Sequence, residues 1–104
     1  MVEIITTEQF EEKVLKSDVP AIVDFYSLHC MPCKKLDPVF EEVAAEYADV
    51  ARFFKMEVNQ NYFLATSCGV NSFPTTIVFR DGELAFRVIG PRDKETLIDE
   101  LELR

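Results

Sequence analysis

Apolar and polar residues follow one another along this chain with two spacings, one typical of strands and one typical of helices. Short apolar runs that have the length and composition of strands occupy residues 4–5, 21–26, 50–58, 75–80 and 83–89. Asp81-Gly82 separates the last two runs and is typical of a type I′ hairpin turn. The pattern therefore predicts five strands, of which the last two pair antiparallel.

Apolar residues at helical spacing fill most of the segments between these strands. The predicted helices cover residues 7–17, 33–47, 62–68 and 93–103. Thr6 and Gln9 have capping-box spacing at the start of the first helix, and Gly69 suits the residue that follows the third. The element order is βαβαβα, then ββα, which predicts an α/β fold with a mixed central sheet flanked by helices. At 104 residues, we expect a single domain over residues 1–104.

The second predicted helix contains an internal proline and a row of acidic residues. Pro38 lies inside the helical pattern, where the loss of one backbone hydrogen bond should kink the helix. Three acidic residues fall on the side opposite the apolar stripe, namely Glu41, Glu42 and Glu46. We therefore expect their carboxylates to face solvent.

Composition narrows the classes of partner and compartment. No uncharged apolar run approaches the roughly 20 residues of a membrane span, and Met1-Val2-Glu3-Ile4 shows no basic region followed by an apolar core. A cytoplasmic protein without a membrane partner is therefore expected. The net charge of −8 argues against nucleic acid, because phosphate is bound by Lys and Arg. Three cysteines do not form the disulfide framework of a small secreted protein.

The candidate chemistry lies in Cys30-Met31-Pro32-Cys33, directly after the strand at residues 21–26. A thiol on the first turn of a helix faces free backbone N–H groups and the positive end of the helix dipole, which favour the thiolate. A second thiol two residues away can attack a mixed disulfide formed on the first. The alternatives are structural thiols or half of a zinc site, for which the chain offers only Cys68 and His29 as further Cys or His ligands.

In this motif and beyond it the chain resembles the thioredoxin family. The family pattern is a strand ending in an aromatic pair, then Trp-Cys-Gly-Pro-Cys-Lys, then a proline inside the following helix. The residues here that correspond to the family's motifs are Phe25-Tyr26, His29-Cys30-Met31-Pro32-Cys33-Lys34, Pro38, Asp24, Phe73-Pro74-Thr75, Asp81-Gly82 and Gly90. The chain departs from the pattern at His29, Met31 and Tyr26, which replace Trp, Gly and often a second Trp.

The resemblance implies the thioredoxin fold and a protein-disulfide reductase. It implies that Cys30 attacks a substrate disulfide, that Cys33 resolves the mixed disulfide, and that Asp24 takes the proton from Cys33. It also implies a cis peptide bond before Pro74, facing the two cysteines. The expected substrate-binding residues are His29, Met31, Pro32, Phe73, Pro74 and Gly90. The expected partners are disulfide-containing proteins and a thioredoxin-reductase-like flavoprotein, with no bound cofactor and a monomeric chain.

Asp24 interrupts an otherwise apolar strand, so we expect a buried carboxyl with a raised pKa. The alternative is a surface aspartate on an edge strand. Lys55 is either its neighbour, as the matching lysine of the family is, or a solvated lysine. Cys68 is interpreted as a buried, inert thiol, with a regulatory or metal-binding thiol as the alternative.

His29 and Met31 flank Cys30 in a short loop and should be exposed. A histidine there can tune the thiol because histidine gains a charge near pH 7; the alternative is neutral drift. Three other functions remain open for the chain as a whole. They are a more oxidising or isomerase-like enzyme, a thioredoxin-fold binding module without turnover, and metal or cluster binding through the cysteines.

Overall fold

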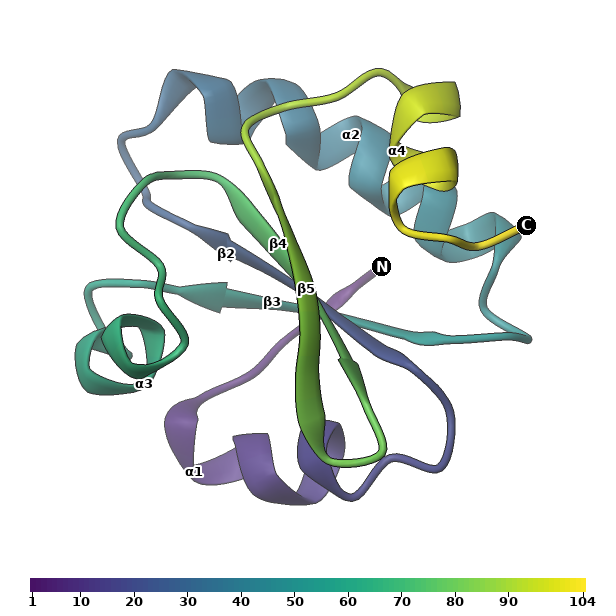
Figure 1. The fold of residues 1–104 in the computed structure, drawn as a ribbon. Coiled ribbons are helices and arrows are strands. Elements are labelled where there is room, and N and C mark those ends of the chain that lie inside the picture. The colour runs from purple at the N-terminus through teal and green to yellow at the C-terminus, as the bar shows by residue number, and fades with distance from the viewer.

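The computed structural model describes all of residues 1–104 and has a five-stranded sheet at its centre (Figure 1). The strands are β1 (Glu3–Ile4), β2 (Ala21–Tyr26), β3 (Arg52–Glu57), β4 (Thr75–Arg80) and β5 (Glu83–Ile89). They lie side by side in the order β1-β3-β2-β4-β5. The first three run parallel, whereas β4 runs antiparallel to β2 and β5 antiparallel to β4. The predicted α/β fold with a mixed sheet is confirmed.

Helices cover both faces of this sheet. They are α1 (Thr7–Phe10), which continues as a π-helical segment over Glu11–Leu15, then α2 (Met31–Glu46), α3 (Tyr62–Ser67) and α4 (Lys94–Glu100). In Figure 1, α2 and α4 lie above the sheet, and α1 and α3 lie on the other side. None of these helices is long and apolar enough to cross a membrane.

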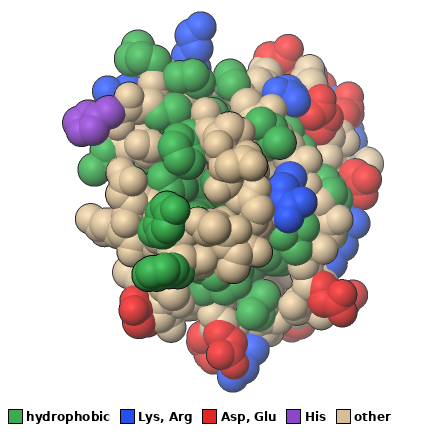
Figure 2. All heavy atoms as spheres, turned by 60° about the vertical axis from the view of Figure 1, so that its left-hand side comes forward, with side chains coloured by type: hydrophobic (Ala, Val, Ile, Leu, Met, Phe, Trp, Pro, Cys, Tyr) green, Lys and Arg blue, Asp and Glu red, His purple; other side chains and the backbone are tan.

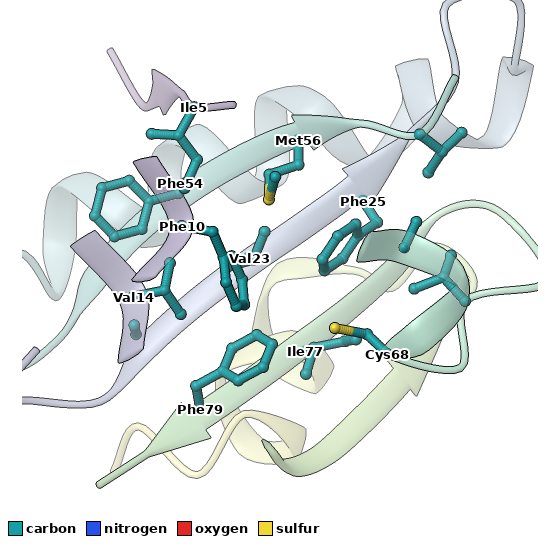
Figure 3. Packing of buried hydrophobic residues seen from close by; sticks show 14 residues of the cluster. Ile5, Phe10, Val14, Val23, Phe25, Phe54, Met56, Cys68, Ile77 and Phe79 are labelled. Carbon is teal, nitrogen blue, oxygen red and sulfur yellow. The ribbon is translucent and has the colours of Figure 1, made fainter. Parts of the chain in front are cut away.

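The hydrophobic core is divided by the sheet into two clusters. One joins the side of α2 and α4 to residues such as Ile22, Phe53 and Val78. The other joins α1 and α3 to the opposite face of the same strands. Figure 3 shows this second cluster, in which the rings of Phe10 and Phe79 lie nearly perpendicular, with 5.2 Å between their centroids. β2 is buried on both faces because it lies between β3 and β4 and under helices on each side.

Cys68 lies in this second cluster, with its sulfur pointing inward beside Phe25 and Ile77 (Figure 3). The thiol is free and buried, and burial raises its pKa. The interpretation as a buried thiol is therefore confirmed. Gly69, the next residue, has a φ of +78° and ends α3 as expected.

The hairpin and several element boundaries agree with the sequence pattern. Residues 21–26, 75–80 and 83–89 form the strands predicted for them. Asp81 and Gly82 both have positive φ, as a type I′ turn requires. The capping box is also present, since the N–H of Thr6 donates to Oε1 of Gln9 at 3.0 Å.

Other boundaries differ by one or more residues. The first strand is Glu3–Ile4 rather than residues 4–5, and the third is shorter than residues 50–58 because the chain is still turning after α2 at Val50. Lys94–Glu100 is shorter than the helix predicted over residues 93–103, since Asp93 caps it by accepting from the N–H of Thr96. α2 begins two residues before Cys33 and continues through Pro38.

Candidate active site

One edge of the sheet brings together segments that are far apart in the sequence. β2 and β3 run parallel, and β4 runs antiparallel to β2, so the end of β2 lies beside the start of β4. Phe25 is in register with Thr75, the first residue of β4. The loop that leads from Tyr26 to the cysteines and the loop that ends at Pro74 therefore share this edge.

The two cysteines form a disulfide at the N-terminus of α2. Cys30 is the N-cap residue, and the backbone N–H of Cys33 donates to Cys30 Sγ at 3.1 Å. This contact and the positive end of the helix dipole stabilise negative charge on Cys30 when the pair is reduced. Cys30 is half-buried, whereas Cys33 is 5% exposed. The two sulfurs are thus unequal in their access to another protein.

The sequence pattern had placed the start of this helix at Cys33. It begins at Met31 because Pro32 fits the first turn, where its missing N–H and fixed φ cost nothing. Cys30 takes the cap position as a result.

Asp24 lies in the pocket that Cys33 also lines, a pocket of about 330 Å³. Its carboxyl is buried at 1% exposure, and Oδ1 accepts no hydrogen bond. Burial raises the pKa of Asp24 from an ordinary 3.8 to about 7; the Lys55 ammonium opposes this rise and Asp37 adds to it. The expectation of a buried carboxyl with a raised pKa is confirmed, and the alternative of an edge-strand surface aspartate is wrong.

Lys55 is in register with Asp24 on the neighbouring strand and is 8% exposed. Its ammonium pairs with Asp37 and, at 2.7 Å, with Glu41, both on α2. Burial alone would lower the pKa of Lys55, but the hydrogen bonds to these two carboxylates raise it overall. The lysine stays charged and is not the solvated residue that the sequence left open.

Asp37 and Glu41 are two site residues that the apolar and polar pattern of the sequence does not identify. Glu41 had been placed with the solvent-facing carboxylates, but it is only partly exposed and binds Lys55. The signal was present in the spacing, because Cys33, Asp37 and Glu41 follow one another at intervals of four residues and so share one face of a helix.

The segment before β4 contains the cis peptide bond that the resemblance implied. The Phe73–Pro74 peptide bond is cis, Pro74 is buried and Phe73 is exposed. Gly90 has a φ of +91°, a conformation that favours glycine, and its N–H donates to the Pro74 carbonyl at 2.8 Å. Pro74 and Gly90 are therefore in direct contact at the edge of the sheet.

The remaining candidate residues are exposed around the disulfide. His29, Met31 and Pro32 are all exposed, as expected for the first two. Leu28 and Ile89 add further exposed apolar side chains. Figure 2 shows this side of the molecule, where apolar side chains spread across the face and the single histidine projects at its margin.

No group of three or more His, Cys, Asp or Glu side chains is placed to share a metal ion. His29 is exposed and Cys68 is buried in the core. The chemistry that this site supports is the reversible opening of the Cys30–Cys33 disulfide, and this makes the chain a dithiol–disulfide oxidoreductase.

Comparisons with known proteins define the family. The family model described as Thioredoxin matches residues 1–103. Thioredoxin of Rickettsia bellii is 35% identical over 95% of this chain and 94% of its own. Thioredoxin 1 of Synechococcus elongatus is 35% identical over 94% of this chain and 92% of its own. Thioredoxin M-type, chloroplastic, of Pisum sativum is 34% identical over 97% of this chain and 59% of its own. The chain belongs to the thioredoxin family and is a protein-disulfide reductase.

Proposed function

We propose that the protein reduces disulfides in other proteins by a two-step exchange in which Cys30 and Cys33 have different roles. The Cys30 thiolate attacks one substrate sulfur, forms a mixed disulfide and releases the other substrate sulfur as a thiolate. Cys33 then attacks Cys30 Sγ, which closes the Cys30–Cys33 disulfide and releases the second substrate thiol. Two electrons pass from the dithiol to the substrate. The greater exposure of Cys30 and the N–H bond to its sulfur support this assignment.

Asp24 is proposed to take the proton from Cys33 when this thiol attacks. The observation that carries the proposal is a buried carboxyl, with a pKa of about 7, that lines the same pocket as Cys33. When the pKa of a base lies near the working pH, about half of the molecules carry the base in its ionised form, and this form is still strong enough to accept a proton. The transfer runs directly or through one water molecule in this pocket.

The substrate is proposed to lie across the exposed surface around the disulfide. His29, Met31 and Pro32 border the cysteines on one side. Phe73, Pro74 and Gly90 are proposed to border them on the other, because the start of β4 lies beside the end of β2 and Gly90 binds Pro74. An extended segment of the substrate would follow the backbone at Pro74. The apolar character of this surface fits an unfolded or flexible segment better than a charged ligand.

The oligomeric state, the electron donor and the location of the protein are also part of this proposal. We propose a monomer of one domain, since a single sheet and its helices include the whole chain. A thioredoxin-reductase-like flavoprotein would return electrons to the Cys30–Cys33 pair, so that the protein acts as an electron carrier. We place it in the cytoplasm; the bacterial relatives match it over nearly their full length, although the relative from pea has a chloroplastic name.

Serine variants of the two cysteines test the assignment of their roles. Cys33→Ser should accumulate a stable mixed disulfide with a substrate such as insulin, because the resolving thiol is absent. Cys30→Ser should form none, and Cys68→Ala is the matched control that keeps both reactive thiols. Mass spectrometry identifies the trapped cysteine. Equal trapping on both cysteines, or an absence of insulin reduction by the unchanged protein with dithiothreitol as electron donor, contradicts the proposal.

A further inference from the structure

Charged side chains from three elements lie at the pocket that Cys33 lines. Asp24 from β2, Lys55 from β3 and Asp37 from α2 line this pocket, and Glu41 from α2 binds Lys55 from outside the pocket lining. Two of the three carboxylates, those of Asp37 and Glu41, bind the one ammonium. Lys55 contacts only the two carboxylates of α2, while Oδ1 of Asp24 accepts no hydrogen bond.

The positions of Asp37 and Glu41 on α2 explain why the Lys55 ammonium contacts these two carboxylates and not that of Asp24. The helix presents both carboxylates to the same side because they are four residues apart. The side chain of Lys55 is 10% exposed, so it is held between the sheet and the helix. Asp37 is half-exposed at 50% and can keep its charge at little cost, whereas Asp24 is fully buried. The ammonium is thus drawn toward the helix and away from the strand.

We propose that Asp37 is a positioning residue that keeps Asp24 protonated at higher pH by holding the Lys55 ammonium on the helix side of the pocket. Asp37 also places a second negative charge near Asp24, which acts in the same direction. This inference rests on the proposed role of Asp24, since it explains why a carboxyl beside a lysine still serves as a base near neutral pH.

The other groups that face Asp24 do not replace Asp37 in this role. On β4, the residue in register is Thr76, whose hydroxyl does not titrate in this range. On α2, Cys33 is tied in the disulfide, and Lys34 lines the pocket but is exposed. On its own strand, Tyr26 lines the pocket, and burial raises its pKa further above the neutral range. Lys55 and Asp37 are therefore the charged neighbours that set the state of Asp24, with Glu41 as second anchor of the lysine.

Removing the charge of Asp37 tests this role without leaving Lys55 unpaired. In Asp37→Asn, Glu41 still binds Lys55 at its Oε2, so the lysine is not left unpaired. The ammonium becomes freer to approach Asp24, and one negative charge is lost. Both changes favour the ionised form of Asp24. We expect the midpoint of its titration to fall by about 0.5–1 pH unit.

The experiment is a carbon-13 NMR titration of the Asp24 carboxyl in the oxidised protein, where Cys33 does not titrate. Asp37→Glu retains the charge and should restore the original midpoint at least in part. Glu42→Gln is the matched control, because Glu42 lies on the same helix and pairs with Lys94 instead of Lys55. Asp37→Ala, which places a strong helix former at a half-exposed position, repeats the test should the amide disturb folding. A midpoint in Asp37→Asn and Asp37→Ala equal to that of the unchanged protein overturns the inference, as does an equal shift in Glu42→Gln.

A second measurement keeps this inference distinct from the proposed function. The pH dependence of the release of substrate from the mixed disulfide is recorded for the same variants by rapid mixing. If the NMR midpoint and the kinetic midpoint fall together in Asp37→Asn, both proposals are supported. A lower NMR midpoint with unchanged kinetics supports the role of Asp37 and overturns Asp24 as the proton acceptor. An unchanged NMR midpoint overturns the role of Asp37 whatever the kinetics show.

Discussion

Replacement of Asp24 by asparagine should stabilise the protein in a way that depends on pH. The pKa of Asp24 is raised from 3.8 to about 7 by burial. Below about pH 4 the carboxyl is protonated in the folded and the unfolded chain, so it contributes nothing to pH dependence. Between about pH 4 and 7 the unfolded chain loses the proton and the folded chain keeps it, so stability falls as the pH rises. Above about pH 7 Asp24 is ionised in both the folded and the unfolded chain, and stability falls no further on its account.

The size of this loss follows from the pKa difference. Each pH unit between the folded and the unfolded pKa corresponds to about 1.4 kcal/mol. Ionised Asp24 therefore costs the folded state about 4 kcal/mol at pH 8, which is a large part of the 5–15 kcal/mol typical of a domain. Asparagine has nearly the same shape and cannot ionise. The gain in Asp24→Asn should rise from about 2 kcal/mol at pH 5 to about 4 kcal/mol at pH 8.

Urea denaturation followed by far-ultraviolet circular dichroism measures this gain, since the chain has no tryptophan to report by fluorescence. Both proteins are kept oxidised, so that the cysteines of the pair do not titrate. Asp49→Asn is the control, because Asp49 is exposed in the turn after α2. A gain that is the same at pH 5 and pH 8, or one below about 1 kcal/mol at pH 8, would refute the reasoning.

Two further predictions concern the third cysteine and the histidine. Cys68→Ala should lower the free energy of unfolding by about 1 kcal/mol because it removes a buried sulfur from the core, and the rate of insulin reduction should not change; a clear loss of rate would show that Cys68 takes part in the cycle. His29→Trp should lower the reduction potential of the Cys30–Cys33 pair by about 10–20 mV, because a histidine beside Cys30 stabilises the thiolate and the disulfide has no charge to stabilise. Equal potentials of the two proteins in a glutathione redox titration would show that His29 has no such effect.

The sequence predicts best those parts of the fold that depend on neighbouring residues. Residues 21–26 form a strand as predicted because a continuous apolar run of that length suits a strand buried on both faces. The turn at Asp81-Gly82 depends on two residues that accept positive φ. The burial of Asp24 follows in the same way, since a strand of apolar neighbours brings its single carboxyl with it into the core.

The charged part of the site could not be predicted from such local patterns. A helix that carries Asp37 and Glu41 has the composition of a solvated surface, and only the position of Lys55 across the pocket turns them toward the protein. That position depends on the register between β2 and β3, which pairs residues more than 30 apart in the sequence. The start of α2 was misplaced for a related reason, because a cysteine is not a usual N-cap residue.

The central place of β2 in the sheet has a consequence for the protein during its synthesis. The ribosome delivers Cys30 and Cys33 before it delivers β3 and β4, the two strands that flank β2. Until those strands emerge, Lys55 has not joined the pocket and nothing from β4 covers the edge beside the cysteines. The pocket that Asp24, Cys33 and Lys55 share is therefore complete only once β3 has joined the sheet beside β2.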